Sequence, residues 1–373
     1  MTDPTAASSG ITYAAAGVDT EAGDRAVELM KSAVAKTHGP EVLGGVGAFA
    51  GLFDASALLS YQRPLLASST DGVGTKIVIA RSMGVHDTIG QDLVAMVVDD
   101  IVVCGAKPLV MTDYIACGRV VPERIADIVR GIAEGCSMAG VALVGGETAE
   151  HPGVMEPDDY DVAGAAIGVV EADALLGPER VAAGDVVVAM ASSGLHSNGY
   201  SLVRRVVAHA GWSLDTHVDE LGRTVGEELL EPTRIYSRLC VDLAASVPGL
   251  HAFSHVTGGG LAANVARVLP VGLAATVDRG SWELPPVFSL VQAAGGVPWH
   301  DLEGTLNLGV GMVAVVSPSD ADSLIAASAA AGVPAWALGT VVADDGRATG
   351  PDVVRGSKGV SGGAVYLSGE YRA

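Results

Sequence analysis

The sequence predicts an α/β protein of two domains, built from mixed α and β layers. Three observations support this prediction. The 373 residues exceed the usual size of one hydrophobic core, so two domains are the default. Hydrophobic residues make up 49% of the chain and charged residues 17%, which is typical of a packed globular protein. In both halves, strand-like apolar runs lead into loops of small residues and then into helical patterns.

The first expected helix covers residues 24–36, because Val27, Met30 and Val34 recur on one helical face. Lys31 falls on the same face. A lysine at the edge of an apolar stripe usually extends toward water, so its position alone favours a surface role over an inward contact with a phosphate.

Further elements follow in order along the chain. A helix is predicted over 122–139, with Pro122 in its first turn and Gly140 as its stop signal. A polar passage with Gly and Pro at 171–184 indicates a domain boundary. Apolar runs predict strands over 64–67, 109–115, 141–144, 160–170 and 185–190, and helical patterns resume over 200–210 and 261–269.

We therefore divide the chain into a flexible N-terminus (1–12), a first domain (13–172), a second α/β domain (173–349) and a tail (350–373). The first ten residues and the tail, which is rich in Gly and Ser, are expected to be poorly ordered.

Composition excludes several classes of function. The net charge of −21 disfavours nonspecific binding to nucleic acid or to an anionic membrane. Neither a secretory signal nor a long apolar run is present, so we expect no membrane span. The four cysteines are scattered without a C-x-x-C pattern, which argues against a disulfide framework or a zinc site and fits a cytoplasmic protein.

The most informative feature is a pair of carboxylates, Asp99 and Asp100, inside the apolar stretch 93–105. A helix there would be apolar almost all round and therefore buried. Buried carboxylates are costly unless hydrogen bonds or a cation offset the loss of solvation. Asp92, seven residues earlier, returns to nearly the same face, so these side chains suggest a hard-cation site, most simply Mg²⁺ with a polyphosphate.

Two more carboxylates follow apolar strands. Asp71 lies in the loop 70–76, whose glycines allow close backbone approach and whose Lys76 can meet a phosphate. Asp-Gly is also an ordinary turn dipeptide, but Asp71 does not stand alone. Glu147 follows Gly145 and Gly146 at the end of another strand, a common position for ligands in open α/β sheets.

A glycine-rich segment at 44–51 contains the pattern G-x-G-x-x-A. The dinucleotide fingerprint needs a strand before this pattern and a helix after it, and neither is evident, so we reject a dinucleotide site. A mobile flap over phosphates and a plain surface loop remain equally good interpretations.

The second half holds two similar loops before helices, one containing His196, Ser197 and Asn198 and the other His255 and Thr257. Each is compatible with a simply capped helix and a surface histidine. Exposed N–H groups at helix starts also seat anions, and two such loops in one domain favour a phosphorylated substrate.

These segments together resemble the aminoimidazole ribonucleotide synthetase superfamily of ATP-dependent enzymes. The residues 100–108 are similar to its D-x-x-x-x-G-A-x-P signature, and matching motifs run from about Tyr13 to about Val342. The other segments that carry the resemblance are 13–19, 44–47, 71–76, 86–90, 145–150, 159–164, 196–201 and 255–260.

The resemblance implies a homodimer in which the N-terminal domains, which bind ATP, join in a closed barrel. The implied reaction is an ATP-dependent ring closure of formylglycinamidine ribonucleotide to aminoimidazole ribonucleotide, with release of ADP and phosphate, in purine synthesis. The formyl oxygen would be phosphorylated, a nitrogen of the amidine side would attack that carbon, and phosphate would leave.

The resemblance also implies roles for individual residues. Lys31 and His196 would be catalytic, although the position of Lys31 in its helix alone favours a surface role. Mg²⁺ would be held by Asp71, Asp99, Asp100 and Glu147, although relatives often have Asn at the position of Asp99. ATP would contact Gly45, Gly47, Thr70, Asp71, Lys76, Asp100, Gly105 and Ala106, and the substrate would contact Ser197, Asn198, His255, Thr257, Gly258 and Gly259.

Sister enzymes with the same fold are less compatible with the chain. A selenophosphate synthetase would need a reactive cysteine near the N-terminus, and no cysteine precedes Cys104. A hydrogenase maturation protein would end in cysteine, whereas this chain ends in Ala373. Formylglycinamidine synthase is usually far longer, thiamine-phosphate kinase is a weak alternative, and a non-catalytic nucleotide-binding dimer would have lost the carboxylates.

Overall fold

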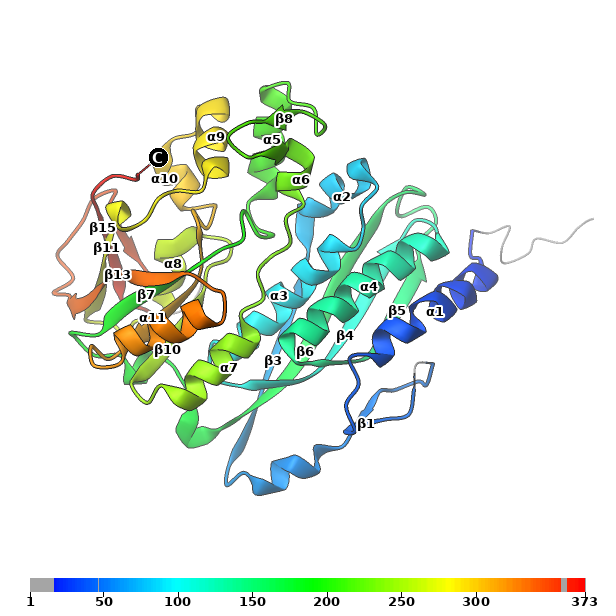
Figure 1. The fold of residues 1–373 in the computed structure, drawn as a ribbon, viewed down its shortest axis with the longest axis horizontal. Helices are drawn as coiled ribbons and strands as arrows, with labels where there is room; N and C mark the ends of the chain where they lie inside the picture. Colours follow the sequence, from blue (N-terminus) through cyan, green and yellow to red (C-terminus); the bar gives the residue numbers. More distant parts are fainter. Residues whose placement is uncertain (1–16, 46, 357–360, 373) are drawn as a thin grey trace, which may run out of the picture.

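The computed structural model describes residues 17–45, 47–356 and 361–372. It contains a four-stranded sheet and a seven-stranded sheet, each with its own helices, and two short two-stranded ribbons (Figure 1). The predicted flexible segment 1–12, the first residues of the motif at 13–19 and Val46 lie outside the described residues. Among the described helices, none is long and apolar enough to cross a membrane.

The four-stranded sheet has the order β3 (Pro64–Gly72), β6 (Tyr160–Glu171), β4 (Lys107–Cys117), β5 (Ala142–Glu150). The outer pair β4 and β5 is parallel, and the other pairs are antiparallel. Two strands are longer than expected. The predicted loop 70–76 begins with strand residues that pair with β6, and the Gly-Gly-Glu segment at 145–147 continues β5.

Helices α1 (Thr20–Ala35), α3 (Thr88–Val102) and α4 (Pro122–Ala139) cover one face of this sheet (Figure 1). Helix α2 (Ile77–Met83) follows β3 and contacts α3 and α6. The predicted helix 122–139 is confirmed, and Gly140 ends it with a positive φ of 74°. The predicted apolar helix around Asp99 is also confirmed as α3, which is buried along most of its length because it lies between the sheet and the second domain. Ahead of β3, β1 (Val42–Leu43) pairs with β2 (Leu52–Phe53).

The seven-stranded sheet belongs to the second half. Its order is β10 (Leu250–His255), β12 (Val310–Val316), β7 (Val186–Ala191), β13 (Ala335–Ala343), β11 (Leu273–Asp278), β15 (Ala364–Ser368), β14 (Val353–Arg355). The helices of this half are α5 (Tyr200–His209), α6 (Val225–Leu229), α7 (Ser237–Ser246), α8 (Gly260–Arg267), α9 (Pro286–Gly295), α10 (Trp299–Glu303) and α11 (Ala321–Ala330). A ribbon of β8 (His217–Val218) and β9 (Arg223–Thr224) precedes α6.

The expectation of a poorly ordered tail is wrong for its described residues. β15 pairs in parallel with β11 and antiparallel with β14, so the tail completes the sheet. Ala364 and Val365 are fully buried there. The Gly- and Ser-rich composition hid a short run of apolar residues, and an apolar run at the edge of an existing sheet gains burial and strand pairing at once.

We expect Val365→Asp to destabilise the second domain by about 3 kcal/mol, because it places an unpaired carboxylate in the core. The melting temperature should fall by at least about 6 °C, measured by circular dichroism. Ser361→Asp, which adds the same charge at an exposed tail position, is the control and should leave it within about 1–2 °C. Equal melting curves for both variants would show that the tail does not contribute to the core.

Candidate active site at the domain junction

The two domains meet where the segment after β3 and the helix α3 face two loops of the second domain. Ser197 Oγ donates a hydrogen bond of 2.7 Å to the backbone carbonyl of Val73. Asn198 Nδ2 lies 3.4 Å from Met96 Sδ on α3. His255 Nδ1 lies 2.9 Å from Asp100 Oδ1 at the end of the same helix. Residues from both predicted loops therefore contact the first domain directly.

The second-domain residues predicted to bind substrate lie on adjacent loops. A Cβ at Gly258 would lie 3.5 Å from Asn198 Oδ1, so the loop before α8 lies beside the loop before α5. Gly259 and Gly260 have positive φ values of 104° and 72°, which glycine adopts without strain. Thr257 accepts a hydrogen bond from Asn264 Nδ2 through its backbone oxygen. The starts of two helices thus converge on one region, as expected for an anion site.

Asp71 faces Asp100 and His255 across this junction. Burial raises the pKa of Asp71, and the negative charge of Asp100 adds to the effect while His255 opposes it. Asp99 is fully buried, and both of its oxygens lie 3.1 Å from the backbone N–H of Tyr236. Burial raises the pKa of Asp99 to about 7.

The predicted set of four metal ligands is corrected by the structure. Across the described residues, no group of three or more His, Cys, Asp or Glu side chains is placed to hold a metal ion. The carboxylate of Asp99 accepts a hydrogen bond from the backbone N–H of Tyr236. Glu147 lies on β5, where it pairs with Tyr114 of β4, and β6 and β4 separate it from Asp71 on β3. Asp71 and Asp100 remain as neighbouring carboxylates.

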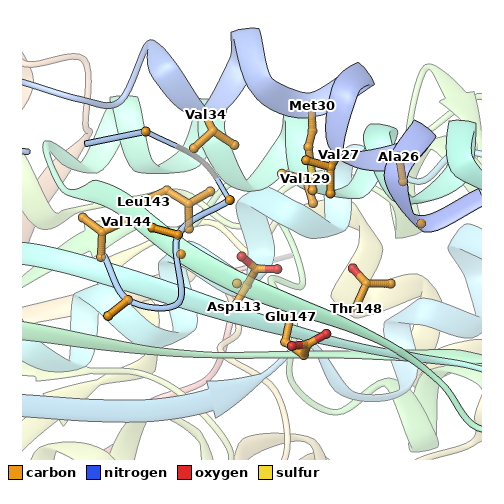
Figure 2. Close-up of a pocket in the computed structure, with 17 residues that line it drawn as sticks. Ala26, Val27, Met30, Val34, Asp113, Val129, Leu143, Val144, Glu147 and Thr148 are labelled. Carbon is orange, nitrogen blue, oxygen red and sulfur yellow. The ribbon is translucent and has the colours of Figure 1, made fainter. Parts of the chain in front are cut away.

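Glu147 instead lines a cavity of about 270 Å³ between α1, the glycine segment and β5 (Figure 2). Gly45 and Gly47, the predicted flap, also line it. Asp113 and Thr148 point toward α1, whereas Glu147 points away from it (Figure 2). The remaining lining residues are Gly23, Ala26, Val27, Met30, Val34, Ala48, Ala50, Val129, Leu143, Val144, Gly145 and Gly146.

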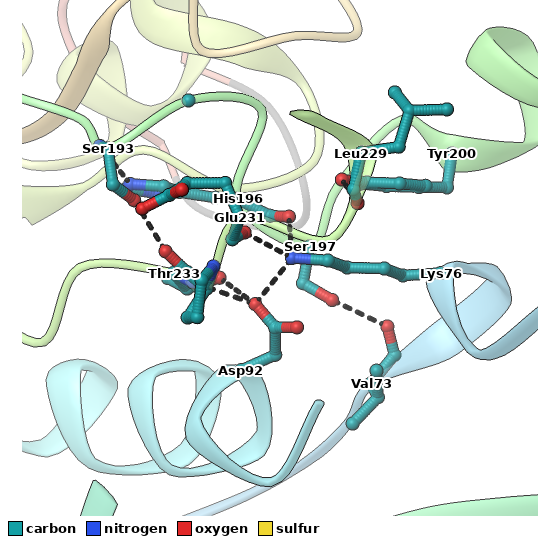
Figure 3. A network of polar contacts seen from close by, with 12 residues as sticks. Val73, Lys76, Asp92, Ser193, His196, Ser197, Tyr200, Leu229, Glu231 and Thr233 are labelled. Carbon is teal, nitrogen blue, oxygen red and sulfur yellow. Dashed lines mark hydrogen bonds and ion pairs between the residues drawn. The ribbon is translucent and has the colours of Figure 1, made fainter. Parts of the chain in front are cut away.

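Lys76 is part of a buried network that joins the domains (Figure 3). Its side chain is fully buried, and Nζ donates hydrogen bonds to Asp92 Oδ1 at 2.9 Å, to the backbone oxygen of His196 at 3.1 Å and to that of Glu231 at 2.6 Å. Thr233 donates to the same Asp92 oxygen through both its N–H and its hydroxyl. Burial lowers the pKa of Lys76 and raises that of Asp92, while each charge opposes the shift of the other.

This network corrects two predictions. Lys76 was expected to meet a phosphate of ATP, but all three of its N–H donors are already used within the protein. Asp92 was grouped with the cation-binding carboxylates, and the cation that offsets its burial is the ammonium group of Lys76.

The two predicted catalytic residues are not brought together. His196 is 1% exposed, with a positive φ of 61°, and its Nε2 accepts a hydrogen bond of 3.2 Å from the N–H of Ser193. Burial lowers its pKa well below the usual value, so the ring is neutral. Lys31 is exposed on α1, which packs on α4 within the first domain, and forms an ion pair with Glu28.

Three further residues were predicted to contact ATP, and the structure places them as follows. Gly105, with φ of 82°, closes the turn after α3, and a side chain there would meet Leu176 at 3.2 Å. Ala106 is fully buried in the core. Thr70 alternates with Asp71 along β3 and therefore points to the face of the sheet opposite the helices.

Sequence reasoning missed Asp113, Thr233 and Tyr236. Asp113 had a signal, because it is the one charged residue in the predicted strand 109–115. The backbone N–H groups of Thr233 and Tyr236 donate hydrogen bonds to the buried carboxylates of Asp92 and Asp99. A contact made by a backbone N–H cannot be predicted from a pattern of side chains.

We expect Lys76→Met to destabilise the protein by about 3–5 kcal/mol, because it leaves Asp92 buried without its cation. Urea unfolding followed by fluorescence measures this. The double variant Lys76→Met/Asp92→Asn should recover a large part of the loss, since a neutral amide oxygen still accepts from Thr233. Lys36→Met, at an exposed position, is the control. A double variant as unstable as the single one would mean that the charge of Asp92 is not the cause.

Comparison with known proteins agrees with this architecture. The family model of the N-terminal domain of AIR synthase related proteins matches residues 53–170, and that of the C-terminal domain matches residues 182–350. A phosphoribosylformylglycinamidine cyclo-ligase of Geobacillus kaustophilus is 51% identical over 330 residues, covering 88% of this chain and 95% of the relative. One of Anaeromyxobacter sp. is 50% identical over 340 residues, covering 91% and 98%.

Solved structures share the fold at low sequence identity. Thiamine-monophosphate kinase from Stenotrophomonas maltophilia superposes with a TM-score of 0.65 at 18% identity, covering 92% of this chain and 96% of the other. The hydrogenase maturation protein HypE in complex with ATP gives 0.57 at 16% identity, covering 87% of each chain. Because the sequence matches cover most of the chain at about 50% identity, the chain belongs to the phosphoribosylformylglycinamidine cyclo-ligase family.

Proposed function

We propose that the protein catalyses the ATP-dependent ring closure of formylglycinamidine ribonucleotide to aminoimidazole ribonucleotide in purine biosynthesis, with release of ADP and phosphate. The observation that carries this proposal is about 50% identity to relatives of that name over about nine-tenths of the chain. The junction supports it, because two carboxylates of the first domain face two helix starts of the second.

Asp71 and Asp100 fit a magnesium ion. Both are carboxylates, the hard oxygen donors that Mg²⁺ prefers, and their mutual repulsion is the kind that a divalent cation relieves. Mg²⁺ commonly takes only one or two protein carboxylates and completes its shell with water and phosphate oxygens, so a preformed cage is not needed. When bound, the ion would neutralise charge on the triphosphate during phosphoryl transfer.

The loops before α5 and α8 would hold the phosphorylated substrate opposite these carboxylates. The hydrogen bond from Ser197 to Val73 and the contact of His255 with Asp100 fix both loops against the nucleotide-binding domain. In the proposed reaction the formyl oxygen attacks the γ-phosphorus and ADP leaves. A nitrogen of the amidine side then attacks the activated carbon, and phosphate leaves as the ring closes. Phosphoryl transfer depends mainly on such positioning.

We also propose that two copies pair through the uncovered face of the four-stranded sheet, in the barrel expected for the family. Leu66, Tyr114 and Ile167 are 66%, 42% and 41% exposed, respectively. Their register positions place all three on the face opposite the helices. Exposed apolar side chains gathered on one sheet face favour an interface.

For the division of the chain, we propose the boundary near residue 172, because β6 ends at Glu171 and the two family matches leave 171–181 between them. The described tail residues then belong to the second domain. The four cysteines are free, which supports the proposed cytoplasmic location.

We expect Asp100→Asn to reduce turnover at least about 100-fold with the fold intact, because it removes charge opposite the triphosphate. ADP release and formation of the imidazole product are measured with formylglycinamidine ribonucleotide while Mg²⁺ is varied. Asp242→Asn, at an exposed site on α7, is the control. Wild-type turnover by Asp100→Asn at matched Mg²⁺ removes Asp100 from the ligand set. ADP without imidazole product in the wild type, or neither, rejects the proposed reaction.

For the dimer, we expect Ile167→Asp to shift the protein to monomers in sedimentation velocity, because two copies would bury like charges together. Val154→Asp changes an exposed apolar residue outside the sheet and should leave the dimer intact. A dimer that tolerates Ile167→Asp, or a monomeric wild type, contradicts pairing through this face.

A further inference from the structure

The loop of residues 192–198, which leads into α5, is held in a strained conformation. His196 in this loop and Leu308, on the segment before β12, have positive φ values of 61° and 49°. Within the described part of the chain, no other residue except glycine has a positive φ. A side chain in this conformation costs free energy, so it persists only where the surrounding structure holds it. The contacts that hold these two residues therefore bear on function.

Asn307 joins the two strained segments. Its side chain is buried, Nδ2 donates a hydrogen bond of 2.9 Å to the backbone oxygen of Gly194, and Oδ1 accepts one of 2.8 Å from the N–H of Gly309. Ser192 Oγ lies 3.2 Å from the same Oδ1 and 2.9 Å from the oxygen of Gly194. The N–H of Ser192 also donates to the backbone oxygen of Gly309 at 2.9 Å. The start of the loop is thereby connected to the segment before β12.

The partners of Asn307 require an amide side chain. The backbone oxygen of Gly194 can only accept a hydrogen bond, and the N–H of Gly309 can only donate one. Asparagine carries one acceptor and one donor on the same planar group, so it satisfies both partners. Aspartate has nearly the same shape, but it would place a negatively charged acceptor against the oxygen of Gly194, and the two would repel.

The other end of the loop contacts the first domain. The backbone oxygen of His196 accepts a hydrogen bond from Lys76, and Ser197 Oγ donates one to the backbone oxygen of Val73 (Figure 3). The loop is thus fixed at its start by Asn307 and at its end by the first domain, with the strained residue between them. Because this loop is one of the two that would hold the substrate, a shift at its start would move the substrate.

The segment that carries Asn307 also supports the second of these loops. A Cβ at Gly199, before the start of α5, would lie 2.4 Å from Leu306 Cδ2. A Cβ at Gly260, at the start of α8, would lie 1.7 Å from the backbone oxygen of Glu303. Both helix starts therefore rest directly on residues 303–306.

Arg279 and the tail fix this segment from its other side. The carboxylate of Glu303 forms an ion pair with the guanidinium group of Arg279 and accepts a hydrogen bond of 2.7 Å from the hydroxyl of Tyr371. The side chains of Arg279 and Glu303 are only 13% and 11% exposed, so salt screens their attraction little. Asn307 is therefore carried by a firmly held segment.

We propose that Asn307 is a positioning residue for the ring closure. It holds the loop 192–198 in the strained conformation that places the start of α5 against the substrate, and it acts through this loop without touching the reacting atoms. The inference rests on the proposed function, because that function supplies the substrate of the loop.

The test is steady-state kinetics of the full-length protein with formylglycinamidine ribonucleotide, ATP and excess Mg²⁺. We expect Asn307→Asp to raise the KM for formylglycinamidine ribonucleotide about 10–100-fold and to change the KM for ATP less than about 2-fold, because only the substrate loop shifts. A merely structural role would lower the amount of active enzyme, and hence the apparent kcat, without moving either KM. Gln292→Glu is the matched control. It also replaces an amide that donates to a backbone oxygen, that of Val297, and should leave both KM values unchanged.

Ser192→Ala removes one hydroxyl from the same cluster and should raise the KM for formylglycinamidine ribonucleotide about 2–10-fold. An unchanged value in folded Asn307→Asp, or an equal rise in both KM values, overturns the inference and leaves the proposed function standing. If Asn307→Asp does not fold, an unchanged value in Ser192→Ala overturns it instead. A wild type that forms no imidazole product overturns the proposed function and this inference together.

Discussion

The buried ion pair between Lys76 and Asp92 is the constraint on which the domain junction depends. Besides its bond to Asp92, Lys76 Nζ donates hydrogen bonds to the backbone carbonyls of His196 and Glu231 in the second domain. One ammonium group therefore connects α3 with two segments of that domain. An ammonium group in a dry core cannot lose these partners cheaply, which fixes the loops around it. The same segment carries Asp71 five residues earlier, so burying Lys76 also holds Asp71 opposite Asp100.

Local patterns were sufficient for much of the fold. The helix that ends at Gly140 and the apolar helix α3 could be predicted because their signals lie within the elements themselves. Partners could not be predicted in the same way. The sequence showed that Asp92 needs a compensating cation, but a metal ion and a lysine both satisfy that need, and only the tertiary structure brings Lys76 to it. The wrong assignment of Asp92 has this physical origin.

Strand register explains most of the remaining differences at the site. Thr70 and Asp71 were grouped in one ATP loop, yet as neighbours in β3 they point to opposite faces. Glu147 was expected beside Asp71, but two strands lie between β3 and β5. A period of two along each strand is visible in a sequence, whereas the order of strands in the sheet is not. Asp113 and Gly146, far apart in sequence, are opposite each other for the same reason.

The carboxylates of the first domain fall into two classes according to their partners. Asp92 and Asp99 are fully buried and have protein donors, a lysine in one case and a backbone N–H in the other, so their burial is already compensated. Asp71 lies opposite Asp100 with only His255 as a nearby cationic group, and its pKa is raised. A protein with a net charge of −21 can bind an anionic nucleotide only where cations or N–H groups outweigh the local field. Asp71 is therefore the carboxylate at which the proposed Mg²⁺ would add positive charge that the chain itself supplies only through His255.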